Sequence, residues 1–224
     1  MSATSRARSG AEKAERRMAL LAAAFELLEE RSGEMASVAE VARRAGVAKG
    51  TFYLYFPSRE AVYLALLEEQ VHAWLDSWAA EATEPAARYR PGLSALATSF
   101  ARTGFRRPLL FPLAARSAAV LEPGVETAAA HRFRLGLSRH LETIGARLAG
   151  VLPGLTPAQA GDLLERSYAL LLGLWQLLAP LGGSRSPLDA DDLAALRADL
   201  ARQAEEATAA LWRGTAGRGA GQGG

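Results

Sequence analysis

A short stretch of this chain combines side chains that can donate hydrogen bonds to phosphates or to bases. Lys49 has an ammonium group, Thr51 an aliphatic hydroxyl, and Tyr53 and Tyr55 phenolic hydroxyls. Such groups are common partners of phosphate oxygens and base edges in DNA. Gly50 lies among them, and its missing side chain would let the backbone approach DNA closely. These residue types predict contacts to a nucleic acid if one helix presents them together.

Two short helices and a tight turn would position these groups. Ser37 can cap a helix, and Glu40 three residues later completes a capping box. Gly46 stands where this helix must end and the chain must take a left-handed conformation. A second helix over roughly 49–55 would bury Phe52. This is the helix-turn-helix pattern, whose second helix enters the DNA major groove. The apolar face of the first helix comprises Val38, Val41, Ala42 and Ala45.

Residues 19–67 resemble the DNA-binding domain of the TetR family of bacterial transcriptional regulators. The matching core, from Val41 to Ala61, reads Val-Ala-x-x-Ala-Gly-Val-Ala-Lys-Gly-Thr-Phe-Tyr-x-Tyr-Phe-Pro-Ser-Arg-Glu-Ala. The preceding helix fits as well, with residues 23–28 as its buried stripe. The chain departs from the family at Ser32-Gly33, where Gly and an aromatic residue are usual, and at Ala36, where Thr is common. Both departures concern the loop between the first two helices.

The resemblance implies which residues contact DNA. Residues 49–51 would read bases, while Tyr53 and Tyr55 would bind phosphates or, alternatively, only pack. Ala39 occupies a position that often reads a base in the family, so its helix should read little sequence. Arg44 is expected to be solvated. The predicted DNA-binding set is Ser37, Ala39, Arg43, Ala48, Lys49, Gly50, Thr51, Tyr53, Tyr55 and Arg59.

Composition and motifs exclude several kinds of chemistry. The 224 residues contain no cysteine, which excludes disulfides and thiolate metal sites. His131 and His140 do not have the i, i+4 spacing of a metal pair. The chain has no HExxH motif, Gly-rich phosphate loop or nucleophile elbow. We therefore expect no metal, no cofactor and no catalytic site, and a helical enzyme is a remote alternative.

The first residues are rich in arginine and lysine, although the net charge of the chain is only +2. Residues 1–11 should form a flexible basic arm, which either follows a phosphate backbone or is merely a solvated tail. No apolar stretch follows this start, so no signal peptide is expected. The apolar run over 169–174 is too short to cross a bilayer. A cytoplasmic protein without a membrane partner is expected.

The predicted fold is all-α. An N-terminal three-helix helix-turn-helix DNA-binding domain over 12–57 precedes a larger helical regulatory and dimerisation domain over 58–213. Residues 214–224 should be a disordered Gly-rich tail. Pro108 can occupy the first turn of a helix, which Pro112 should then break or kink. The other helices of the larger domain are predicted over 58–82, 93–107, 125–152, 157–178 and from 189 or 191 to 212.

The helix over 157–178 is apolar on most sides, so it should be buried on most sides. It is either a central core helix or, as the resemblance implies, part of a four-helix dimer interface shared with the last helix. A dimer would also match a palindromic operator. The predicted interface residues are Leu164, Leu171, Leu178, Leu193, Leu196 and Leu200.

The resemblance further implies a small-molecule cavity in the larger domain. Aromatic walls with a few polar groups suit such a cavity, although aromatic residues at helical spacing are usually plain core. The predicted protein is thus a homodimeric repressor that an unidentified small-molecule effector releases from a double-stranded DNA operator. The alternative is a dimeric DNA-binding protein that needs no ligand. Candidate lining residues are Phe100, Phe105, Phe111, His131, Phe133, Tyr168 and Trp175.

Overall fold

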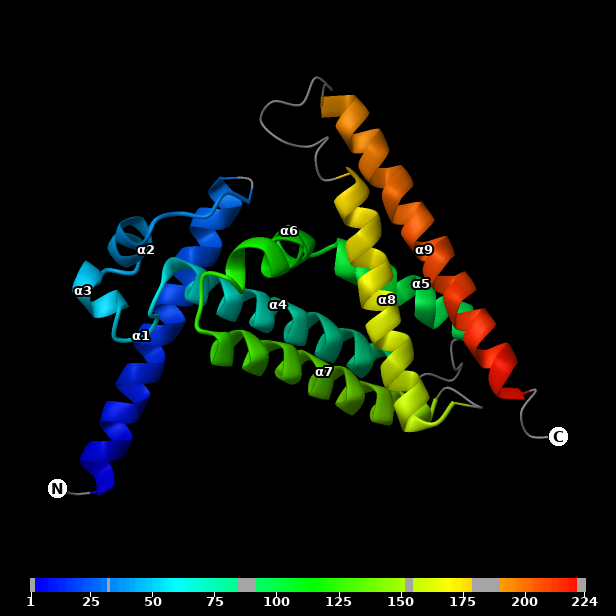
Figure 1. Ribbon diagram of the computed structural model, residues 1–224, viewed down its shortest axis with the longest axis horizontal. Helices are drawn as coiled ribbons and strands as arrows, with labels where there is room; N and C mark the ends of the chain where they lie inside the picture. Colours follow the sequence, from blue (N-terminus) through cyan, green and yellow to red (C-terminus); the bar gives the residue numbers. More distant parts are fainter. Residues whose placement is uncertain (1–2, 32, 84–91, 152–154, 179–189, 221–224) are drawn as a thin grey trace. The chain divides into compact units, whose positions relative to one another are not determined.

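The computed structural model describes residues 3–31, 33–83, 92–151, 155–178 and 190–220, and their regular secondary structure is entirely helical (Figure 1). Contacts divide the chain into two compact units, one formed by 1–69 and 112–133 and the other by 70–111 and 134–224. The elements are α1 (Ala3–Glu30), α2 (Val38–Arg44), α3 (Lys49–Phe52), α4 (Arg59–Ala82), α5 (Leu93–Phe105), α6 (Leu110–Arg116), a π-helix (Ser117–Leu121), α7 (Thr127–Ala149), α8 (Pro157–Leu178) and α9 (Ala190–Ala220).

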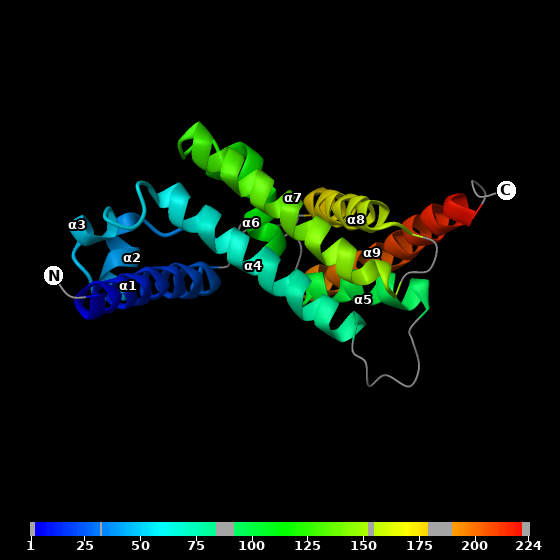
Figure 2. The ribbon, with the colours of Figure 1, turned by 90° about the horizontal axis from the view of Figure 1, so that it is seen from below.

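The first unit contains the predicted helix-turn-helix. Ser37 caps α2 and forms the complete capping box with Glu40, and Gly46 has a φ of 70°, both as expected. Figures 1 and 2 both show α2 and α3 beside α1. The helix α3 ends at Phe52, earlier than expected, and the chain continues to Phe56 in turns. Phe52 and Phe56 are buried and anchor this short helix.

The first unit runs past the expected domain boundary at residue 57 to residue 69, and it also includes the distant segment 112–133. The Ser58 hydroxyl donates to the Gly124 carbonyl oxygen over 2.9 Å. Gly33, with a φ of 92°, lies beside Pro112, and a Cβ built on it would be 3.8 Å from the Pro112 Cβ. Sequence patterns do not reveal such long-range packing. Residues 112–133 therefore belong with the helix-turn-helix, whereas α4 divides between the two units after Glu69.

The break expected at Pro112 does not occur, because α6 continues past it to Arg116. Pro112 is the third residue of α6, where a backbone N–H would have no intrahelical partner. Proline is tolerated there. The helix is interrupted later instead, because residues 117–121 form a π-helix.

The helical ends extend beyond the expected ones. The first helix, α1, begins at Ala3, within the segment expected to be a flexible arm, and α9 continues to Ala220, through most of the expected tail. Adding a residue to an existing helix costs less than starting a helix, which favours such extensions. Flexibility in either segment stays a prediction.

An aromatic core fills the second unit. Trp74 and Trp78 on α4 pack against Phe100 on α5, with ring centroids 4.5 and 4.9 Å away, and Trp78 also contacts Trp212 on α9. Buried indole N–H groups need acceptors. Trp212 donates to the Ser167 hydroxyl on α8 over 2.8 Å. This bond joins α9 to α8, while α9 also packs along α5.

Candidate nucleic-acid interface and regulatory core

The residues predicted to contact bases lie together on an exposed surface. Ala48, Lys49 and Gly50, at the start of α3, are exposed, and Thr51 is half-exposed. A Cβ built on Gly50 would meet nothing within 4 Å, so no protein atom covers this position. Phe52 points the other way and is fully buried. One side of α3 is thus fixed in the core, and the other is free to meet a partner.

Two tyrosines follow on the same segment. Tyr53 is exposed, with 49% of its surface accessible, and its ring meets the Phe52 ring edge-on at 5.6 Å. Tyr55 is half-exposed. Tyr53 therefore does not serve only as core packing, since about half of it is available to contact a ligand.

The exposed side of α2 presents Ser37, Ala39 and Arg43. The Ser37 hydroxyl donates to Glu40 over 2.7 Å and also caps the helix, so it is engaged within the protein. Arg43 makes no ion pair with any residue that the structure describes. Arg43 is therefore the better candidate of the two for a phosphate contact, because the Ser37 hydroxyl is already bonded within the protein.

Other arginines are committed to partners. Arg44 is not simply solvated, because it forms ion pairs with Glu30 at 2.7 Å and Glu26 at 3.1 Å on α1. Arg59 pairs with the neighbouring Glu60 at 2.9 Å, which competes with its predicted contact to DNA. Among basic residues near the start, Arg17 stacks on the Phe56 ring at 5.2 Å.

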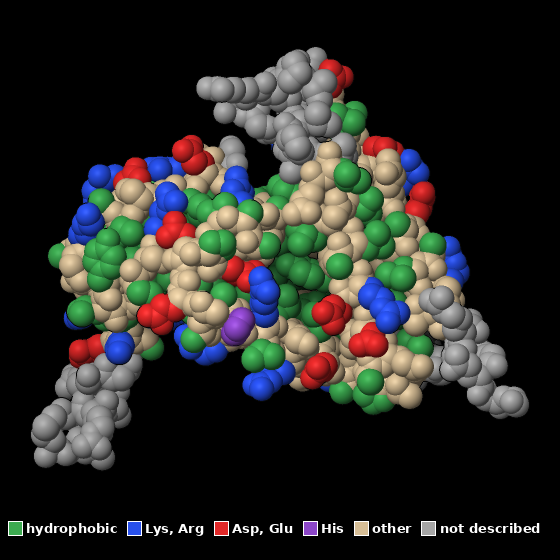
Figure 3. All heavy atoms as spheres, in the orientation of Figure 1, with side chains coloured by type: hydrophobic (Ala, Val, Ile, Leu, Met, Phe, Trp, Pro, Cys, Tyr) green, Lys and Arg blue, Asp and Glu red, His purple; other side chains and the backbone are tan. Residues whose placement is uncertain are grey.

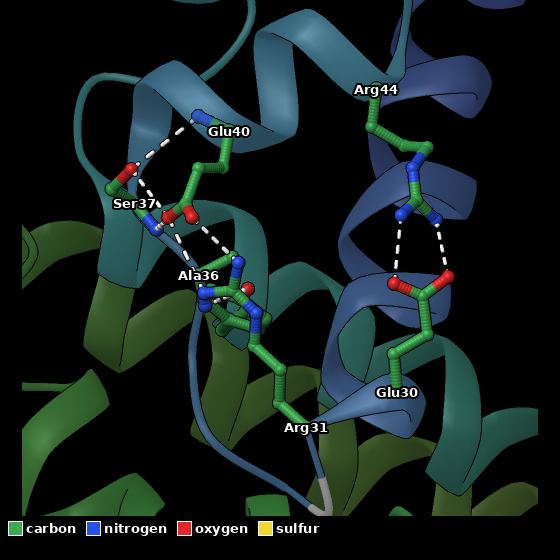
Figure 4. A network of polar contacts seen from close by, with 7 residues as sticks. Glu30, Arg31, Ala36, Ser37, Glu40 and Arg44 are labelled. Carbon is green, nitrogen blue, oxygen red and sulfur yellow. Dashed lines mark hydrogen bonds and ion pairs between the residues drawn. The ribbon is translucent and has the colours of Figure 1, made fainter.

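Sequence reasoning missed a polar network beneath α2 (Figure 4). Arg31, after the end of α1, donates to both carboxylate oxygens of Glu40 over 2.6 and 3.3 Å. The bonds from Arg31 and Ser37 lower the pKa of Glu40 to about 2. The Tyr63 hydroxyl on α4 accepts a bond from the Ala36 N–H over 2.8 Å. Nothing in the spacing of these residues along the chain indicated the pairs.

The predicted cavity residues do not gather around one space. Phe100 and Phe111 are buried and packed against other rings of the second unit, and Phe105 stacks on Phe111 at 4.8 Å. His131 is exposed on α7, and it lies with Phe133 in the first unit. The set splits because helical spacing places side chains within a helix but does not decide which compact unit a helix segment joins. Tyr168 and Trp175, both half-exposed on α8, remain as candidates.

A groove between α5 and α9 has a volume of about 310 Å³, and polar and apolar atoms contribute about equally to its surface. None of the predicted cavity residues lies along it. Its charged side chains already have partners, such as Arg202 with Asp199 and Glu205 with Arg102. The lining residues are Ser94, Thr98, Arg202, Glu205, Glu206, Ala209 and Arg213.

The predicted dimer interface faces inward in part. Leu164, Leu171 and Leu200 are at most 6% accessible within one protomer, so they have almost no surface left for a partner. Leu196 is half-exposed, and the side chains of Leu178 and Leu193 lie outside the described residues. Two leucine stripes run along α8: one contains Leu164 and Leu171, and the other contains Leu170, Leu174 and Leu177. The prediction placed the first stripe in the dimer interface, whereas that stripe faces the core.

The opposite side of α8 is exposed. It presents Ala169, Gly173 and Leu177, with Leu170 and Leu174 half-exposed beside them, and Leu177 is 74% accessible. No charged residue occurs from 167 to 178. Figure 3 shows uncharged side chains over the upper part of α8 and charged ones over its lower part. This surface is here called the α8 apolar face.

The described part of the chain contains neither a cluster of metal ligands nor a helix that could span a membrane. Among those residues, no three histidine, aspartate or glutamate side chains gather in an arrangement that could hold a metal ion. None of the helices found there is long and apolar enough to cross a membrane.

Comparisons with known proteins show which family has this architecture. Residues 20–66 match the family described as bacterial regulatory proteins, tetR family, and residues 69–219 match the tetracyclin repressor-like C-terminal domain. The HTH-type transcriptional regulator EthR from Mycobacterium tuberculosis is 48% identical over 58 residues. That stretch covers 26% of this chain and 27% of EthR, so the match spans about a quarter of this relative.

Solved structures match over more of the chain. A TetR-family transcriptional regulator from Streptomyces coelicolor is 22% identical, with a TM-score of 0.53, over 91% of this chain and 83% of the other. A structure from Mesorhizobium loti, assigned to the same family, is 18% identical, with a TM-score of 0.54, over 89% and 96%. At such identities the likeness shows the fold alone. With the domain matches across both parts, the chain belongs to the TetR family of bacterial transcriptional regulators, and not to a class of enzymes.

Proposed function

We propose that this protein is a homodimer that regulates transcription by binding a palindromic DNA operator through α3. The observation that supports the proposal most strongly is the exposed surface of Ala48, Lys49 and Gly50, which the buried Phe52 fixes in place. A lysine and an uncovered backbone at the start of a recognition helix suit contacts to base edges in the major groove. Action on DNA implies a cytoplasmic location.

Selection from a random duplex library tests this function. The selected sequences should contain two inverted half-sites whose centres lie one helical turn apart, about 34–36 Å. Affinity for them should exceed affinity for shuffled DNA by roughly 10³-fold or more. Binding that is indifferent to sequence would contradict a role as a specific regulator.

The α8 apolar face supplies the proposed dimer contact. Leu177 is 74% accessible, although burial of a large aliphatic side chain is favourable. Its neighbours Ala169 and Gly173 are small enough for a second helix to approach closely. An isologous contact of this face would give the two-fold symmetry that an inverted operator requires. Leu196 on α9 can contribute at the edge.

A matched pair of substitutions tests the contact. Leu177→Glu should convert the dimer into a folded monomer, because a charge would be buried against a partner without a counterion. Leu135→Glu, on the exposed side of α7, should leave the dimer intact, since Leu135 is 55% accessible and lies outside the proposed face. Light scattering measures both. A dimeric Leu177→Glu variant would rule out this face.

The protein is proposed to be a repressor whose effector is a small molecule that binds the second unit and lowers operator affinity. Tyr168 and Trp175 on α8 are the retained contact candidates. The ligand-independent alternative gains support from Phe100 and Phe111, which pack as plain core. Thermal-shift screening of a metabolite library separates the two. A true effector must weaken operator binding by the same factor as operator weakens its own binding.

A further inference from the structure

The position of α2 depends on contacts beyond its own residues. The helix has seven residues and buries only Val41 and Ala42 among them. Helices this short are unstable without tertiary contacts. Ion pairs connect both ends of α2 to the preceding helix region: Arg31 pairs with Glu40 at 2.6 Å near the start, and Arg44 pairs with Glu30 at 2.7 Å at the end (Figure 4).

The carboxylate of Glu40 is fully engaged. It accepts bonds from both terminal nitrogens of Arg31, and also from the backbone N–H and the hydroxyl of Ser37. These contacts fix the start of α2 relative to the end of α1. The side chains are only partly exposed, at 32% for Arg31 and 29% for Glu40. The arrangement therefore has the geometry of a clamp between two helices.

The clamp also decides the charge beneath the proposed DNA surface. Glu40 follows Ala39 and precedes Arg43, both of which are exposed on α2. An unpaired carboxylate at this place would repel a DNA backbone, which presents a dense row of negative charges. The guanidinium of Arg31 cancels that charge. Both terminal nitrogens of Arg31 are bonded to Glu40.

We propose that Arg31 is a positioning residue for DNA recognition, which holds α2 through Glu40 and neutralises its carboxylate without itself contacting a phosphate. The inference rests on the proposed function, because it presumes that α2 and α3 face DNA. Arg43 provides the contrast, since it lies on the same helix, is exposed and has no ion-pair partner among the described residues.

Loss of a positioning residue and loss of a phosphate contact change the salt dependence of DNA binding differently. Each phosphate contact that is lost lowers the salt slope of binding by about 0.9, or roughly 1.8 for a dimer that loses one in each protomer. Arg31→Gln should weaken binding to the selected operator about tenfold, as expected within a coupled ion-pair network. The salt slope should fall by clearly less than the loss of a phosphate contact in each protomer would give, because only the repulsion by Glu40 is added. Arg43→Gln, the matched control, should weaken binding and lower the slope.

A second substitution separates the two proposed effects of Arg31, which are to hold α2 in place and to neutralise the Glu40 carboxylate. Glu40→Gln keeps a capping-box side chain but removes the charge. In the Arg31→Gln background it should restore part of the lost affinity, because the unpaired carboxylate is gone. Arg31→Lys, which retains the charge but not the two-pronged contact, should lie between wild type and Arg31→Gln. Circular dichroism and thermal unfolding establish that each variant is folded.

Several outcomes would overturn the proposal. A salt slope lowered by about 1.8 in Arg31→Gln would make Arg31 a phosphate contact. Tighter binding by Glu40→Gln alone would also overturn the proposal, because the contact between Arg31 and Glu40 would then oppose recognition instead of supporting it. Equal affinity of Arg31→Gln and wild type would remove Arg31 from recognition altogether. Failure of the wild-type protein to bind any selected duplex is a separate result, which would defeat the proposed function itself.

Discussion

A methyl group placed on Gly145 should destabilise the second unit measurably. In the folded chain a Cβ on Gly145 would lie 2.4 Å from the backbone nitrogen of Gly161 and 2.7 Å from its Cα. Ordinary contact begins at 3.4 Å, and both atoms belong to the backbone, so α7 and α8 must separate by about 1.0 Å. Overpacking of this kind costs about 1–3 kcal/mol. The upper end of this range applies, because a helix backbone cannot move away from the clash by changing a rotamer as a side chain can.

A helix-propensity gain opposes this cost. Alanine is favoured over glycine within a helix by about 1 kcal/mol, so Gly145→Ala should lose about 2 kcal/mol in net unfolding free energy. For a chain of this size the melting temperature should fall by roughly 4–8 °C. Gly214→Ala on α9 is the matched control, because its Cβ would meet nothing within 4 Å. Only the propensity gain applies there, so its melting temperature should rise slightly.

The assay is thermal unfolding followed by circular dichroism, at one protein concentration for all variants because dimer stability depends on concentration. A melting temperature for Gly145→Ala equal to or above that of wild type would refute the reasoning. It would mean that α7 and α8 do not cross in backbone contact at these two glycines.

Two further perturbations follow from the same structure. Gly50→Ala should leave thermal stability equal or slightly higher, because a Cβ there meets no protein atom within 4 Å. It should nevertheless weaken operator binding, because the added methyl group keeps the backbone away from DNA. Unchanged operator affinity in an anisotropy titration would contradict this prediction. Burial and the nearby His72, whose ring centroid is 4.1 Å away, lower the pKa of His140. The unfolded chain therefore binds the proton more readily, and stability should decrease as pH falls below the ordinary histidine value of about 6.5. In denaturant titrations across this pH range, the unfolding free energy of His140→Gln should depend less on pH than that of wild type. An equal pH dependence in the two proteins would contradict the role of His140.

The features that were predicted correctly depend on residues close together in the chain. The capping box of Ser37 and Glu40, the left-handed Gly46 and the buried Phe52 depend on residues close in the chain, and all are confirmed. The range predicted for α8, 157–178, is also confirmed. Alternation of apolar and polar residues, caps and prolines are local signals, so they predict where helices lie.

Long-range packing explains what the sequence could not reveal. Two leucine stripes on α8 are equally apolar, and only the packed fold shows that Leu164 and Leu171 face inward while Leu177 is exposed. The contact of Ser58 with Gly124 joins residues far apart in the chain. No periodicity predicts such a pair. The aromatic residues likewise gave no sign of which rings pack as core.

Operator binding by Lys49→Ala tests the central claim most directly. Lys49 is exposed at the start of α3, so its truncation should not disturb the fold. If Lys49 contacts a guanine, affinity for the selected duplex should fall by about 1–3 kcal/mol, and discrimination against shuffled DNA should fall with it. Equal affinity of the folded variant and wild type for that duplex would contradict DNA recognition through α3.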